Sequence, residues 1–131
     1  MKYQQFDTKE MRPGWINKTW KNDCTVRSLS LVLDHSYEKV FRDLMQFGLE
    51  MGAYPDHDKV WQAYAEDQGL VKNKPPRDSR GKLIKLKDWD YQGKAAVINS
   101  GHLTAVDGGY LIDTWDCRYR PVNSYWERVT G

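Results

Sequence analysis

Apolar residues recur three or four positions apart in the first half of the chain, which is the spacing of one face of an α-helix. The first such stretch runs from about Cys24 to Leu33. The second begins after Ser36, whose hydroxyl is suited to cap a helix, and ends near Gly48 or Gly52. Two helices are therefore predicted in this part of the chain.

The pattern changes near the middle of the chain. A third helix is predicted to start at residues 56–58 and to stop at Gly69. Short β-strand-like runs then follow at Lys94–Asn99, on both sides of Asp107-Gly108, and near 122–126. Helices followed by strands predict an α+β fold, in which N-terminal helices pack on a C-terminal antiparallel sheet.

Cys24 is the first residue of the first predicted helix. Asn22 and Asp23 precede it, and residues of these types accept hydrogen bonds from the free N–H groups of a helix's first turn. A cysteine in that turn lies beside unpaired N–H groups and the positive end of the helix dipole. This position favours the thiolate, which is the nucleophilic form of cysteine. The alternative role for Cys24 is that of a small buried apolar residue.

The dipeptide Asp107-Gly108 predicts a β-hairpin that places a histidine next to a carboxylate. If these two residues form the turn, His102 lies directly opposite Asp113 on the neighbouring strand. A turn at Gly108-Gly109 is the alternative, and it pairs Thr104 with Asp113 instead. We favour the first register because Asp-Gly is a strong hairpin signal.

A carboxylate beside a histidine orients the imidazole and fixes its tautomer, as general-base catalysis requires. His102 is therefore the candidate base and Asp113 the candidate orienting group. Asp116 is the reserve carboxylate if the connecting loop is longer.

Three segments together resemble the papain-like cysteine peptidase fold, and most of all the short papain-like proteins encoded by bacteriophages and the bacteriocin leader peptidases. The segments follow the family's order of cysteine, histidine and carboxylate: Asn22-Asp23-Cys24-x-x-Arg27, Gly101-His102-Leu103-Thr104-Ala105-Val106, and Asp113-Thr114-Trp115-Asp116. The resemblance implies a papain-like fold with Cys24 as nucleophile, His102 as general base and Asp113 as orienting group.

The oxyanion hole departs from the family pattern. These peptidases usually carry a glutamine about six positions before the cysteine, and here that position is Lys18. Asn17 and Asn22 lie nearby, and Asn22 is expected to cap the helix. We therefore assign the oxyanion hole to Asn17 and to the backbone N–H of Cys24.

Two tryptophans, Trp20 and Trp115, lie close in sequence to the candidate nucleophile and carboxylate. We expect them to wall the cleft, because an indole over the histidine–carboxylate pair excludes water and strengthens the hydrogen bond. Arg27 follows the cysteine by one helical turn. We expect it to form a structural ion pair with Asp116 or with the C-terminal region.

Composition limits the other classes of function. A net charge of +2, from 20 basic and 18 acidic residues, is too balanced to predict nucleic-acid binding. The mean hydropathy of −0.80, the lack of a long apolar run and the lack of a signal-peptide pattern predict a cytoplasmic protein without a membrane partner. For a phage protein this means the cytoplasm of the bacterial host. We expect a monomer with one domain at 1–131.

No cofactor is expected from the sequence. Two cysteines, Cys24 and Cys117, provide no disulfide framework. The chain has no Cys-x-x-Cys or His-x-x-x-His pair, which are short-range ligand spacings of zinc sites, and we therefore expect no metal.

Two classes of function fit these residues. The first is a thiol hydrolase that cleaves an amide or isopeptide bond of a protein or peptide through Cys24, His102, Asp113 and a thioester intermediate. A deamidase or transglutaminase would use the same intermediate. The second class is a non-catalytic binding module that masks a host protein on a papain-like scaffold.

Overall fold

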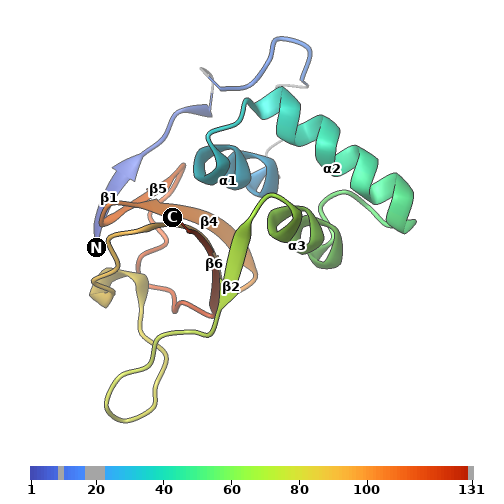
Figure 1. Cartoon of the computed structure of the whole chain (residues 1–131). Helices are drawn as coiled ribbons and strands as arrows, with labels where there is room; N and C mark the ends of the chain where they lie inside the picture. Colours follow the sequence, from blue (N-terminus) through green and yellow to red (C-terminus); the bar gives the residue numbers. More distant parts are fainter. Residues whose placement is uncertain (9–10, 17–22, 130–131) are drawn as a thin grey trace.

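The computed structural model of the protein describes residues 1–8, 11–16 and 23–129 (Figure 1). It contains three α-helices: α1 (Cys24–Leu33), α2 (Tyr37–Met51) and α3 (Asp58–Asp67). Six strands form one sheet: β1 (Lys2–Gln5), β2 (Leu70–Asn73), β3 (Lys94–Asn99), β4 (His102–Asp107), β5 (Tyr110–Asp113) and β6 (Ser124–Arg128). A short 3-10 helix, η2 (Leu86–Asp88), precedes β3. The protein is therefore α+β, as predicted.

The three predicted helices are confirmed, and so is the cap of the second. The Ser36 hydroxyl accepts a hydrogen bond from the N–H of Lys39 at 3.1 Å, and Gly52 ends α2 in the left-handed conformation with φ +66°. Asp23 precedes α1 as expected, but its carboxylate does not cap the helix. It instead bonds to other side chains, as described below. Asn22 lies outside the described residues.

The sheet differs from the prediction in two respects. Its strand order is β1-β5-β4-β3-β6-β2, and β1 pairs with β5 in parallel, whereas the other pairs are antiparallel. The sheet is therefore mixed, and two of its strands, β1 and β2, precede the strands that were predicted. Both of these are four-residue edge strands with few buried side chains, so they lack the alternation of apolar and polar residues that marks a strand in a sequence.

The helices cover one face of the sheet, and η2 with its neighbouring loops covers the other (Figure 1). Successive residues of β3 point to these two opposite faces. Ala96 packs under the helices, whereas Ala95 and Val97 pack with Leu86 of η2. The sheet is thus buried on both faces.

The β4–β5 hairpin has the register that we did not favour. Asp107 pairs with Tyr110, so the two turn residues are Gly108 and Gly109, with φ of +59° and +87°. Glycine adopts positive φ without a steric penalty, and a two-residue turn of this kind needs it at both positions. Gly-Gly therefore meets this demand better than Asp-Gly, and Asp107 stays in β4.

Helix α1 is placed so that its first residue lies at the start of β4. The helix packs between α2 and the sheet, where it contacts β4 and β3. The Ser28 hydroxyl donates a hydrogen bond to the carbonyl of Leu103 at 3.1 Å, which ties the helix to the residue after His102. Within the described chain, no helix is long and apolar enough to cross a membrane.

Candidate active site

Cys24 and His102 are brought together from α1 and β4. The Cys24 thiol is half-buried and lies in hydrogen-bonding range of the His102 imidazole and of the N–H of Leu103. Burial raises the pKa of the thiol, but these two hydrogen bonds and the nearby positive charges of His102 and Arg27 outweigh it. The net result is a lowered pKa of Cys24, and therefore more thiolate at neutral pH.

His102 contacts Asp113, with 2.7 Å between Nε2 and Oδ2. The observed register places Thr104, not His102, opposite Asp113. His102 lies two residues before Thr104 on the same side of the strand, and its long side chain spans this diagonal. The Thr104 hydroxyl donates to the same carboxylate oxygen at 2.6 Å. The predicted contact is therefore present, although the register from which we derived it is wrong.

The charges of this pair stabilise each other. Burial lowers the pKa of His102, but the hydrogen bonds and charges of Asp113 and Cys24 raise it to about 9. Burial raises the pKa of Asp113, whereas the hydrogen bonds from His102 and Thr104 lower it, with a net lowering. At neutral pH the imidazole is therefore protonated and the carboxylate ionised.

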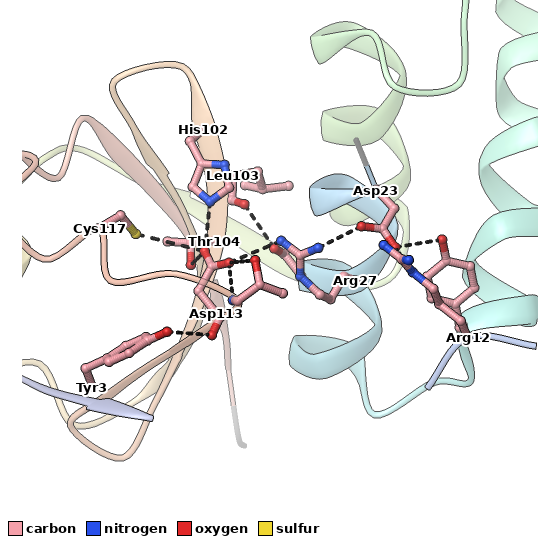
Figure 2. A network of polar contacts seen from close by, with 12 residues as sticks. Tyr3, Arg12, Asp23, Arg27, His102, Leu103, Thr104, Asp113 and Cys117 are labelled. Carbon is pink, nitrogen blue, oxygen red and sulfur yellow. Dashed lines mark hydrogen bonds and ion pairs between the residues drawn. The ribbon is translucent and has the colours of Figure 1, made fainter. Parts of the chain in front are cut away.

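Figure 2 shows that Asp113 is surrounded by donors. Its Oδ1 accepts hydrogen bonds from Arg27 Nη2 at 3.1 Å and from the N–H of Thr114 at 2.6 Å. Asp113 is 1% exposed, so these bonds offset the loss of solvent around the charge. The reserve carboxylate, Asp116, instead pairs with the exposed Arg118 at 2.9 Å.

Arg27 pairs with the C-terminal region, which was one of our two alternatives, but its partner there is Asp113 and not Asp116. It is buried and bridges Asp113 and Asp23, with Arg27 Nη1 at 2.7 Å from Asp23 Oδ1. Asp23 also accepts hydrogen bonds from Arg12 and Tyr37. The predicted structural ion pair therefore exists, but the predicted pairing with Asp116 is wrong. Asp113 lies 86 residues away in the sequence, and helical spacing carries no signal for such a contact.

A cleft of about 590 Å³ opens over the pair of Cys24 and His102. Trp115 lines it, as predicted, and its indole packs against the imidazole with 5.0 Å between ring centroids. The further lining residues that were missed in the sequence include Asp56, Asp58 and Trp61. They belong to the start of α3 and the loop before it. The sequence predicted the start of that helix but gave no indication that it borders the cleft.

Two predicted residues, Asn17 of the oxyanion hole and Trp20 of the cleft wall, lie outside the described residues. The other member of the predicted oxyanion hole is the backbone N–H of Cys24, at the start of α1. N–H groups of a first helical turn have no partner within the helix. Because the Asp23 side chain does not cap α1, it leaves these donors for another acceptor.

Three possible metal ligands, from His102, Asp113 and Cys117, lie within 4.8 Å of one another. Their surroundings do not suit a cation. The carboxylate already accepts hydrogen bonds on both oxygens, and the Arg27 guanidinium lies beside it. Burial raises the pKa of the Cys117 thiol to about 11, so it remains protonated at neutral pH. The donor set therefore fits an orienting carboxylate better than a metal centre.

No protein-family model, curated protein or solved structure matches the chain. Functional conclusions therefore depend on the geometry and charges of the site itself.

Proposed function

We propose that the protein is a thiol hydrolase that cleaves an amide or isopeptide bond of a protein or peptide. The observation that carries this proposal is the arrangement of Cys24 and His102 at one cleft, with the buried Asp113 in contact with the imidazole. A cysteine with a lowered pKa begins a helix beside an imidazole, and a buried carboxylate holds that imidazole. A nucleophile, a base and an orienting group within contact of one another are the signature of covalent catalysis.

The reaction begins from a thiolate–imidazolium pair. Nε2 of His102 is engaged by Asp113, so Nδ1 is the ring nitrogen left for the thiol. The Cys24 sulfur attacks the substrate carbonyl carbon, and a C–S bond forms while the carbonyl electron pair moves onto oxygen. His102 then gives its proton to the leaving nitrogen as the C–N bond breaks. Water attacks the resulting thioester, His102 accepts the water's proton, and the C–S bond breaks to release the acid.

The oxyanion of this reaction would form next to the start of α1. The backbone N–H of Cys24 is one donor, and the positive end of the helix dipole adds to the stabilisation. We propose Asn17 as the second donor, because it lies one position from the place that carries glutamine in papain-like peptidases.

A papain-like relationship is part of this proposal. Three features support it: the nucleophile at the start of a helix, the base on a strand of the packed sheet, and the order of cysteine, histidine and carboxylate along the chain. Under this proposal the protein acts in the cytoplasm of a bacterial cell as a phage-encoded or peptidase-like enzyme.

Activity profiling tests the proposal. Thiol-reactive peptide probes and ubiquitin-like probes should label the wild-type protein, and matched fluorogenic amides should be hydrolysed. Cys24→Ser should abolish both results, whereas Cys117→Ser should leave both intact. Hydrolysis that persists in Cys24→Ser, or a wild-type protein that reacts with none of the probes, would contradict the proposal.

The outer face of α2 favours the second candidate function, a binding module. A groove of about 520 Å³ there is lined by Trp15, Phe41, Met45 and Leu49 among polar side chains. Leu49 is 76% exposed. Exposed apolar surface of this kind is common in protein interaction sites. Rapid, stoichiometric alkylation of Cys24 by iodoacetamide would favour the hydrolase, and an unreactive Cys24 would favour the binding module.

A further inference from the structure

We propose that Arg27 is a positioning residue, whose guanidinium fixes the Asp113 carboxylate and, through it, the imidazole that faces Cys24. This inference rests on the proposed function, in which Asp113 orients His102. The observation that carries it is the place of Arg27 between two buried carboxylates (Figure 2).

The two oxygens of Asp113 face different groups. Oδ2 contacts His102 at 2.7 Å and Thr104 at 2.6 Å, whereas Oδ1 accepts the hydrogen bond from Arg27 at 3.1 Å. Among the described residues, Arg27 is the cation on the side of the carboxylate away from the imidazole. A rotation of the carboxylate that weakened its contact with His102 would also break its contact with Arg27. The guanidinium therefore opposes that rotation.

Arg27 is itself held in place from the other end. Its second amino group, Nη1, donates to Asp23 Oδ1 at 2.7 Å. Asp23 Oδ2 in turn accepts hydrogen bonds from Arg12 Nε at 2.7 Å and from the Tyr37 hydroxyl at 3.0 Å. A planar guanidinium holds its two amino groups in a rigid fork, whereas the ammonium of lysine is one compact charge with rotatable donors. The spacing of the two carboxylates therefore calls for arginine.

The charges along this network alternate in sign. Arg12, Asp23, Arg27, Asp113 and protonated His102 follow one another, each in contact with the next. The Cys24 thiolate continues the series beyond the imidazole. Each buried charge is thus balanced by its neighbours, as buried ions require.

Two other titratable groups face Asp113. The Tyr3 hydroxyl of β1 donates to the Asp113 carbonyl at 3.2 Å, and the Cys117 sulfur lies 3.9 Å from the carboxylate. Burial, followed by the charge of Asp113, raises the pKa of Tyr3, and burial is the main cause of the raised pKa of Cys117. Both groups therefore stay neutral near pH 7. Changes in the Cys24 titration then report on the network and not on these neighbours.

Two substitutions separate positioning from the effect of charge alone. Arg27→Lys keeps the positive charge but replaces the rigid fork that joins the two carboxylates with a single compact ammonium. Asp23→Asn removes a negative charge, which by charge alone would lower the pKa of Cys24. If Arg27 positions Asp113, both variants instead raise the pKa of Cys24. Each variant then slows iodoacetamide alkylation of Cys24 at pH 6 by about tenfold, which is a modest effect for a misplaced catalytic group.

Arg128→Lys is the matched control. Arg128 forms an ion pair with Asp34 at the other end of α1, so its replacement should leave the alkylation profile unchanged. Folding of each variant is checked by its melting temperature. A wild-type profile in folded Arg27→Lys, or a lowered Cys24 pKa in Asp23→Asn, overturns the proposal. If Arg27→Lys does not fold, the direction of the shift in Asp23→Asn decides alone.

The readout is alkylation and not turnover, so it does not depend on a substrate. Failure of the proposed function appears as a wild-type protein that hydrolyses no probe. Failure of the inference about Arg27 appears as an unchanged pH profile in the variants. The two failures are therefore distinguishable.

Discussion

The two cysteines of this protein lie in different regions around the same histidine–carboxylate pair, and their thiols have opposite properties. Cys24 begins α1, borders the cleft and has a lowered pKa. Cys117 lies in the connection between β5 and β6, is fully buried and has a pKa raised to about 11. Burial raises the pKa of both thiols, so burial alone does not separate them.

The neighbouring hydrogen-bond donors and charges make the difference. Cys24 faces the imidazole and receives the field of Arg27, both of which favour the thiolate. Cys117 faces the carboxylate of Asp113, which disfavours it. The two thiols therefore differ because Cys24 lies on the imidazole side of the His102–Asp113 pair and Cys117 lies on its carboxylate side.

The largest expected effect is the selectivity of alkylation. A thiol with a pKa of about 11 is ionised to about one part in 10,000 at pH 7. Ionisation alone favours Cys24 by at least about 100-fold, because its pKa is lowered and the thiolate is the reacting form. Since Cys117 is also fully buried, we expect iodoacetamide to modify Cys24 about 1,000 times faster. Peptide mapping of the modified protein measures the two rates. Comparable alkylation rates of Cys24 and Cys117 would contradict the proposed difference between the two thiols.

His102→Ala should make Cys24 resemble Cys117. Without the imidazole, the thiol loses its main hydrogen bond and its nearest positive charge, so its pKa rises. Turnover of a cleavable probe should fall about 1,000-fold, within the range for loss of a general acid–base group. Retained turnover in a folded variant would show that another base serves Cys24.

The carboxylate comes next in expected effect. Asp113→Asn removes the partner that raises the pKa of His102, so the alkaline limb of the rate profile, expected near pH 9 in the wild type, should move to lower pH. Turnover at neutral pH should fall about 100-fold. Asp116→Asn, the matched control on an exposed ion pair, should change turnover less than about twofold. A larger effect of Asp116→Asn would contradict the assignment of Asp113.

Thr104→Val should give the smallest of these effects. It removes the hydroxyl that donates to Asp113 while it keeps the shape of the side chain. A lost hydrogen bond to a charged group corresponds to a loss of turnover of about tenfold. Thr104→Ser keeps the hydroxyl and should retain most of the activity. Equal losses in the two variants would assign the effect to packing.

Much of the helical half could be predicted because its signals are local. Ser36 caps α2, and Cys24 begins α1, as the sequence indicated. The contact between His102 and Asp113, which belong to the proposed catalytic set, could also be predicted, because the two residues lie on adjacent strands of one hairpin. The register could not be fixed, because Asp107-Gly108 and Gly108-Gly109 are both suited to a two-residue turn. The structure separates them: Gly108 and Gly109 have positive φ, and Asp107 belongs to β4.

Long-range partners could not be predicted from local patterns. The bond from Arg27 to Asp113 joins a helix to a strand 86 residues away, and nothing in the spacing of either segment records it. The same holds for β1, whose parallel pairing with β5 joins the start of the chain to residues 110–113. Asn17 and Trp20 remain predictions for functional tests.

The most direct test of the account is the thiolate absorbance of Cys24 near 240 nm as a function of pH. It is measured in Cys117→Ser, with Cys24→Ser as the blank. The account predicts a midpoint below the usual thiol value of about 8.5, because the imidazolium of His102 stabilises the thiolate. A midpoint at or above that value would contradict the assignment of Cys24 as the nucleophile.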